Sequence, residues 1–149
     1  MGWRNNNLMK YLLLPIALIV VTMLTSCKEN VKQTSSQIET VQSTITVISP
    51  KEVYDSLQED QSLQLLDVRT PEEYGVTHLK SSQNICVTTP GFEEKAAKLD
   101  KSKPVYVYCK SGGRSARASK ILSDMGFTQI YDIQGGITNW QAQDLEVVE

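Results

Sequence analysis

From Thr44 to the C-terminus, short segments typical of β-strands alternate with segments typical of α-helices. The strand-like segments are rich in branched and aromatic residues, and they span 45–48, 63–68, 83–87, 105–108 and 129–133. Strands that are separated by helices pair in parallel through right-handed crossovers. The pattern therefore predicts an α/β fold with an open, mainly parallel five-stranded sheet and helices on both faces.

Start signals in two segments predict where helices begin. Each combines an N-cap hydroxyl, a proline at the first helical position and a capping-box glutamate: Ser49-Pro50-Lys51-Glu52 and Thr70-Pro71-Glu72-Glu73. Glu72 and Glu73 are expected to complement the dipole of the helix that they open. Further helices are expected over 92–99, 115–125 and 137–143.

The first 27 residues carry an export pattern. Arg4 and Lys10 precede an uncharged, mostly apolar run over 12–24, which is shorter than the roughly 20 residues that span a bilayer. The run ends in Leu24-Thr25-Ser26-Cys27, which resembles the lipobox of bacterial lipoproteins. That resemblance implies cleavage before Cys27, acylation of Cys27, and a lipid anchor in a bacterial membrane at the periplasmic face or cell envelope. An uncleaved signal anchor is the alternative.

The chain is accordingly expected to contain a signal peptide over 1–26, a lipidated N-terminus with a flexible tether over 27–43, and a folded domain over 44–149. The tether is polar and rich in Ser, Thr and Gln, so it cannot bury enough surface to fold. The formal net charge is −2, so the overall charge does not favour binding to the polyanionic backbone of nucleic acid. One histidine and three scattered cysteines provide no metal site.

The fourth predicted strand is followed by a short loop that concentrates chemically active residues. The loop has the sequence Cys109-Lys110-Ser111-Gly112-Gly113-Arg114-Ser115. Open parallel sheets place their sites at the carboxyl ends of the strands. Loop N–H groups, the positive end of the following helix, Lys110 and Arg114 all favour a thiolate. The loop thus predicts Cys109 as a nucleophile with a lowered pKa, and Lys110 to Ser115 as a cradle for an anionic substrate.

Four motifs in order resemble the rhodanese-like sulfurtransferase family in its single-domain form. They are Asp67-Val68-Arg69 with Glu73-Tyr74, His78-Leu79 with Asn84-Ile85, Cys109 to Ser115, and Gly135-Gly136-Ile137 with Trp140. The resemblance covers residues 44–146. The chain departs from the family pattern at Thr77, Ser81 and Ser82, where Gly, Gly and Ala are usual. These departures concern a turn rather than the nucleophile.

The resemblance implies sulfur transfer without a cofactor. The Cys109 thiolate would take sulfur from a small donor such as thiosulfate, hold it as a persulfide, and pass it to cyanide, a thiol or a protein cysteine. The four residues between Cys109 and Arg114 are one fewer than in the family's phosphatases. This shorter loop resembles that of the sulfur-transferring members.

The sequence leaves alternatives for the supporting residues and for the function. Asp67 and Arg69 are expected either to orient the loop or to form a plain structural ion pair. His78 is expected to make a structural hydrogen bond, and Trp140 to be a lid or core aromatic. Two alternatives to the enzyme remain: an exported sulfur-carrier or binding module, and a thiol redox protein that uses Cys109 with Cys86.

Overall fold

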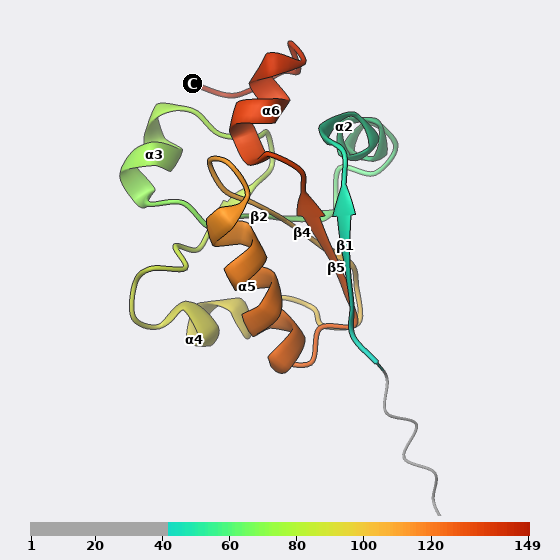
Figure 1. Ribbon diagram of the computed structural model, residues 1–149, viewed down its shortest axis with the longest axis vertical. Helices are drawn as coiled ribbons and strands as arrows, with labels where there is room; N and C mark the ends of the chain where they lie inside the picture. The colour runs from blue at the N-terminus through green and yellow to red at the C-terminus, as the bar shows by residue number, and fades with distance from the viewer. Residues whose placement is uncertain (1–41) are drawn as a thin grey trace, which may run out of the picture. The chain divides into compact units, whose positions relative to one another are not determined.

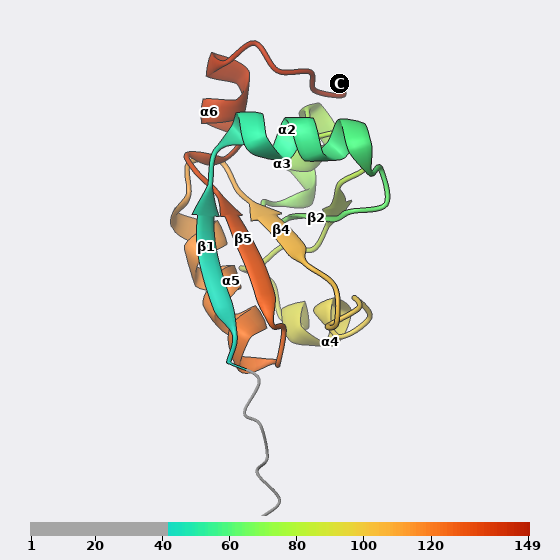
Figure 2. The ribbon, with the colours of Figure 1, turned by 90° about the vertical axis from the view of Figure 1, so that its right-hand side faces the viewer.

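The structure is a computed structural model that describes residues 42–149. The predicted signal peptide, Cys27 and nearly all of the predicted tether lie outside the described residues. The described chain forms one sheet of parallel strands (Figures 1 and 2), in the order β1-β5-β4-β2-β3. The strands are β1 (Thr44–Ile48), β2 (Gln64–Asp67), β3 (Gln83–Asn84), β4 (Val105–Tyr108) and β5 (Gln129–Ile133). The predicted fold class is confirmed.

Within residues 42–149, five helices connect and cover these strands. They are α2 (Pro50–Glu59), α3 (Pro71–Val76), α4 (Phe92–Ala96), α5 (Gly113–Asp124) and α6 (Gly136–Ala142). Both predicted capping boxes form, at Ser49–Glu52 and at Thr70–Glu73. None of the described helices is both long enough and apolar enough to cross a bilayer.

The sheet has a separate apolar core on each face. Along β4, Val105 and Val107 point into the core under α4 and α5, whereas Tyr106 and Tyr108 point into the core under α2 and α6. Figure 1 shows α4 and α5 on one side of the sheet and α2 on the other. Because β4 is covered on both faces, its carboxyl end is a rigid support for the residues that follow it.

Three predicted boundaries differ from the structure by two residues or more, and the others by at most one residue. The third strand has only two residues, because its partner β2 ends at Asp67, which pairs with Asn84. The N–H groups of Ile85 and Val87 still donate to the carbonyls of Asp67 and Val68. The helix α4 ends three residues early, at Ala96. The helix α5 begins at Gly113 rather than at Ser115, because Gly112 adopts a left-handed conformation with φ of 108°. The last difference moves the helix start into the cysteine loop.

Two residues of the family motifs hold the C-terminal segment in place. The indole N–H of the buried Trp140 donates to the carbonyl of Glu146 at 3.0 Å. His78 exchanges two backbone hydrogen bonds with Val148, and its ring stacks on Tyr74 with centroids 4.1 Å apart. These contacts give Trp140 and His78 the structural roles that the sequence predicts.

Candidate active site

Cys109 follows the last residue of β4 and is only 1% exposed. The backbone N–H of Gly112 donates to its sulfur at 3.1 Å. Burial raises the pKa of Cys109, but hydrogen bonds from the N–H groups of Ser115, Gly112 and Ser111 and from the Ser115 hydroxyl outweigh it. The pKa therefore lies below its ordinary value, and the loop favours the thiolate.

The start of α5 explains why these N–H groups are available. Gly112 is the N-cap of the helix, and its missing side chain leaves the first turn without a side-chain acceptor. The first N–H groups of a helix have no partner within it. The Cys109 sulfur takes the place of that acceptor, so an anion bonded to the sulfur also faces free N–H groups.

The start of α6 holds the loop from the other side. The N–H of Ile137 donates to the carbonyl of Cys109 at 2.9 Å, and that of Thr138 donates to the carbonyl of Lys110 at 3.1 Å. Gly136 permits this approach, because a Cβ at that position would lie 2.2 Å from the Cys109 oxygen. The sequence predicts Gly135-Gly136 as a turn; the contact with the loop is a tertiary feature that no local pattern contains.

Glu73 has a second role that the sequence prediction missed. Besides closing the capping box with Thr70, its carboxylate accepts two hydrogen bonds from the Arg114 guanidinium, at 2.6 and 2.8 Å. The Arg114 hydrogen bonds hold the pKa of Glu73 at about 2. Glu73, and then the Cys109 sulfur, raise the pKa of Arg114. Arg114 is therefore a fixed cation beside the sulfur.

Asp67 and Arg69 form a buried ion pair whose side-chain hydrogen bonds, within residues 42–149, go to each other and to the Thr77 carbonyl and the Arg69 backbone. The Arg69 Nε donates to both Asp67 oxygens at 3.0 and 2.9 Å, and its Nη2 donates to the Thr77 carbonyl at 2.7 Å. The guanidinium also lies 5.6 Å from the centroid of the Tyr108 ring. Of the two predicted roles, these contacts favour the structural ion pair, which joins the end of β2 to the end of α3.

Residues 49–143 match the model of the rhodanese-like domain. The chain belongs to the rhodanese-like domain family.

Individual relatives support that assignment. The chain is 36% identical over 98 residues to the probable adenylyltransferase/sulfurtransferase MoeZ of Mycobacterium tuberculosis, covering 66% of this chain and 25% of MoeZ. It is 30% identical over 86 residues to the thiosulfate sulfurtransferase GlpE of Coxiella burnetii, covering 58% of this chain and 78% of GlpE. A crystal structure of a rhodanese-related protein from Thermoplasma volcanium is similar, with 32% identity and a TM-score of 0.61. The match covers 69% of this chain and 97% of the chain in that crystal structure. The chain thus spans only a quarter of the length of MoeZ.

A groove borders the loop of this rhodanese-like domain. It has a volume of about 280 Å³, and the residues that line it are Arg69, Glu73, Val76, Thr77, Lys110, Ile137, Thr138 and Gln141. Lys110 is exposed here. The leading groups that lower the pKa of Cys109 are amides and the Ser115 hydroxyl, and Lys110 lines the wall of the groove.

Cys86 lies apart from Cys109. Both are free thiols, at the ends of β3 and β4, and β2 runs between these two strands. Two strand spacings amount to roughly 9–10 Å, whereas disulfides join Cα atoms less than about 7 Å apart. The pair therefore cannot form a disulfide without backbone movement, which argues against the dithiol alternative.

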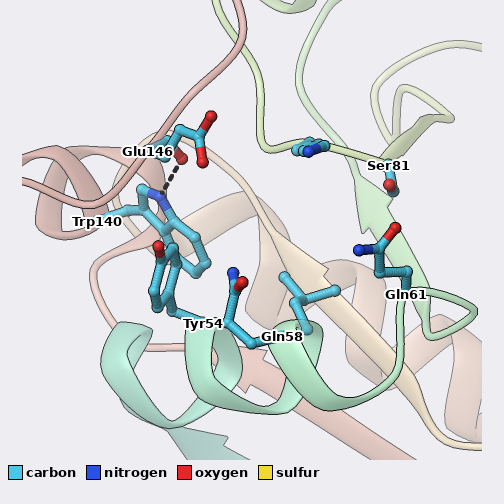
Figure 3. Close-up of a pocket in the computed structure, with 8 residues that line it drawn as sticks. Tyr54, Gln58, Gln61, Ser81, Trp140 and Glu146 are labelled. Carbon is cyan, nitrogen blue, oxygen red and sulfur yellow. Dashed lines mark hydrogen bonds between the residues drawn. The ribbon is translucent and has the colours of Figure 1, made fainter.

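A second, smaller hollow lies between α2, the segment around Ser81 and the C-terminal segment (Figure 3). Its volume is about 70 Å³, and Tyr54, Gln58, Gln61, Trp140 and Glu146 are among its lining residues. None of the predicted site residues lines it. Within residues 42–149, no group of three or more His, Cys, Asp or Glu side chains is placed to hold a metal ion.

Proposed function

We propose that this protein is a sulfurtransferase that carries sulfane sulfur as a persulfide on Cys109. The observation that carries the proposal is the hydrogen bond from the Gly112 N–H to the Cys109 sulfur, at the uncapped start of α5. An attacking thiolate and the terminal sulfur of a persulfide are both anionic, so the same N–H groups stabilise both. Arg114, held by Glu73, adds a fixed positive charge.

The chemistry proceeds in two displacements. The Cys109 thiolate attacks the outer sulfur of a donor such as thiosulfate; a new S–S bond forms, the donor's own S–S bond breaks, and sulfite leaves with its electron pair. An acceptor such as cyanide then attacks the outer sulfur of the persulfide. Thiocyanate leaves, and the Cys109 thiolate is regenerated without any external oxidant or reductant.

Mass spectrometry tests the first displacement directly. The full-length chain is treated with thiosulfate and its intact mass and peptides are then measured. We expect one added sulfur, on the peptide that contains Cys109, and none in Cys109→Ser. Cys86→Ser is the matched control and should still gain the sulfur. A wild-type chain that gains no sulfur, or gains it on Cys86, would contradict the proposal.

We also propose that the protein is a lipoprotein whose anchor places the rhodanese-like domain at the periplasmic face or cell envelope. The support is the Leu24 to Cys27 pattern and the short apolar run before it. In the bacterial host, Cys27→Ser should incorporate no labelled fatty acid and should remain uncleaved. Incorporation equal to that of the wild type would contradict the lipid anchor while leaving the sulfur chemistry unaffected.

A further inference from the structure

The strand β1 forms one edge of the sheet and is exposed along most of its length. Within residues 42–149 it pairs with β5 only (Figure 2), and four of its five residues are exposed. Ile45 and Val47 are 45% and 65% exposed. Ile45 pairs with Ile130, which belongs to the core beneath α5, so Ile45 and Val47 lie on that face of the sheet. Apolar surface therefore adjoins the outer edge of β1.

The outer edge of β1 also presents backbone hydrogen-bonding groups. The Ile48 carbonyl points toward β5, because it accepts from the Gln134 N–H at 2.9 Å. Backbone groups of successive residues alternate between the two edges of a strand. The N–H and C=O groups of Ile45 and Val47 therefore point outward, away from β5, where another strand can bond to them.

The sequence of β1 contains no device that blocks such pairing. Proteins usually protect a strand edge with charged residues, a proline, a bulge or a very short strand. The strand reads Thr-Ile-Thr-Val-Ile, without a charge or a proline, and it pairs with β5 in continuous register without a bulge. The opposite edge is protected, because β3 has only two residues. The β1 edge is thus a template for a further strand.

We propose that β1 pairs antiparallel with β1 of a second copy of this chain, about a two-fold axis at Thr46. In that register Ile45 lies opposite the partner's Val47, and Val47 lies opposite the partner's Ile45. These are the two residues whose backbone groups point outward, so each pair exchanges two hydrogen bonds. Their side chains form an apolar cluster of four, and such β-branched pairs stabilise a sheet. Backbone and side chains therefore favour the same register.

A second copy fits this edge better than the segment that precedes β1. The described chain begins at residue 42, two residues before β1, so the preceding segment has to reverse direction there to pair with β1. Val41-Gln42-Ser43 contains none of the Gly, Asn, Asp or Pro residues that tight turns favour. A second copy needs no turn. Its two-fold pairing is closed, and the joined sheet has the short β3 at both ends.

Disulfide cross-linking of the full-length chain tests the position of the axis. In the proposed register the two Thr46 residues form a pair without backbone hydrogen bonds, with Cα atoms roughly 4.5 Å apart, which a disulfide can span. After oxidation with copper phenanthroline, Thr46→Cys should give a dimer whose two peptides are joined at position 46. Thr44→Cys is the matched control: it lies opposite the partner's Ile48 and should give no more dimer than the wild type.

A charge on the edge tests the apolar pairs. In the Thr46→Cys chain, Val47→Lys should lower the yield of linked dimer by roughly tenfold or more, because each ammonium group would lie against apolar side chains of the other copy. Val76→Lys places the same charge at a similarly exposed valine of α3, 71% exposed, and should leave the yield unchanged. A yield that Val47→Lys does not lower would overturn the proposed interface.

Other occupants of the edge give different products. A link from position 46 to another cysteine of the same chain would place the preceding segment on β1, and a link to a different protein would identify another partner; either result, or no link at all, overturns the proposal. Sedimentation of the detergent-solubilised wild type needs no cysteine variant. It should show a dimer that Val47→Lys converts to a monomer, and a monomeric wild type would contradict the proposal. Residues 44–48 do not line the groove beside Cys109, so sulfur transfer and pairing can fail separately.

Discussion

Cys109 and Cys86 occupy comparable places and differ in what surrounds their sulfur atoms. Each is a buried free thiol just after the carboxyl end of a strand, and the pKa of each lies below its ordinary value. Burial raises the pKa of Cys86, and hydrogen bonds with Thr88 and Thr89 lower it. For Cys109, the opposing donors are mainly backbone N–H groups at the start of a twelve-residue helix.

The comparison shows that a lowered pKa alone does not identify a nucleophile. The sequence provides no cation near Cys86 and hence no obvious reason for its thiolate to be favoured; the hydroxyls and backbone N–H groups of Thr88 and Thr89 supply one. The Thr88 hydroxyl lies 3.2 Å from the Cys86 sulfur and its proton can turn to suit a neutral or an anionic sulfur, whereas the Thr89 hydroxyl donates to the Cys86 carbonyl. The amides around Cys109 are fixed, because α6 and the Glu73–Arg114 pair hold the loop from two sides. Preorganised donors of this kind stabilise charge that develops during a reaction.

Replacing each cysteine by serine in turn should give the largest difference in sulfur-transfer activity. Cys109→Ser should eliminate thiosulfate:cyanide sulfur transfer, because a hydroxyl cannot form a persulfide, whereas Cys86→Ser should keep most of it. Steady-state thiocyanate production by the full-length variants is the measurement. Loss of activity in Cys86→Ser with an intact fold would show that both cysteines take part.

Disturbing the support of the Cys109 loop should have the next largest effect. Gly136→Ala places a Cβ against the Cys109 carbonyl at a positive φ, and we expect a loss of roughly 2–4 kcal/mol in the free energy of unfolding. Gly75→Ala in α3 is the control, because a Cβ there meets nothing within 4 Å. Urea unfolding measures both, and equal stability of the two variants would contradict the tight contact between α6 and the loop.

Releasing Arg114 should have a smaller effect on turnover. Glu73→Gln removes the charge that fixes the guanidinium, and we expect a decrease in kcat of roughly tenfold. Glu72→Gln, exposed on the same helix, should leave kcat unchanged. An unchanged kcat in Glu73→Gln would mean that the fixed cation makes no contribution.

The ion pair between Glu73 and Arg114 predicts that the free energy of unfolding depends on pH. Because the pKa of Glu73 falls from 4.5 to about 2 on folding, its contribution is complete above about pH 4.5 and is lost as the pH falls through 2. The difference in unfolding free energy between wild type and Glu73→Gln should shrink over that interval. A difference that stays constant would contradict the low pKa.

Lys110 should have the smallest effect. Its exposed side chain lines the groove beside Arg69, and exposed ion pairs contribute about 0–1 kcal/mol. Lys110→Ala should therefore raise the KM for thiosulfate by at most a few-fold and leave kcat unchanged. Lys120→Ala, on the exposed side of α5, is the control. A large decrease in kcat for Lys110→Ala would indicate that Lys110 acts directly on the Cys109 sulfur.

The amino-acid sequence by itself determined the α/β alternation, both capping boxes and the place of Cys109 at the end of a central strand. These features depend on signals that act over a few residues: apolar periodicity, N-cap hydroxyls and glycines in a short loop. The same local signals placed the start of α5 two residues late, because the left-handed Gly112 lets the helix begin inside the loop.

Only the tertiary structure decided which distant residues meet. It pairs Glu73 with Arg114 and places Gly136 beneath the Cys109 carbonyl. The physical reason is the strand order, in which β4 lies between β5 and β2. Side chains from connections that are far apart in the sequence therefore meet at the carboxyl end of β4. The spacing of these residues along the chain does not predict that they meet.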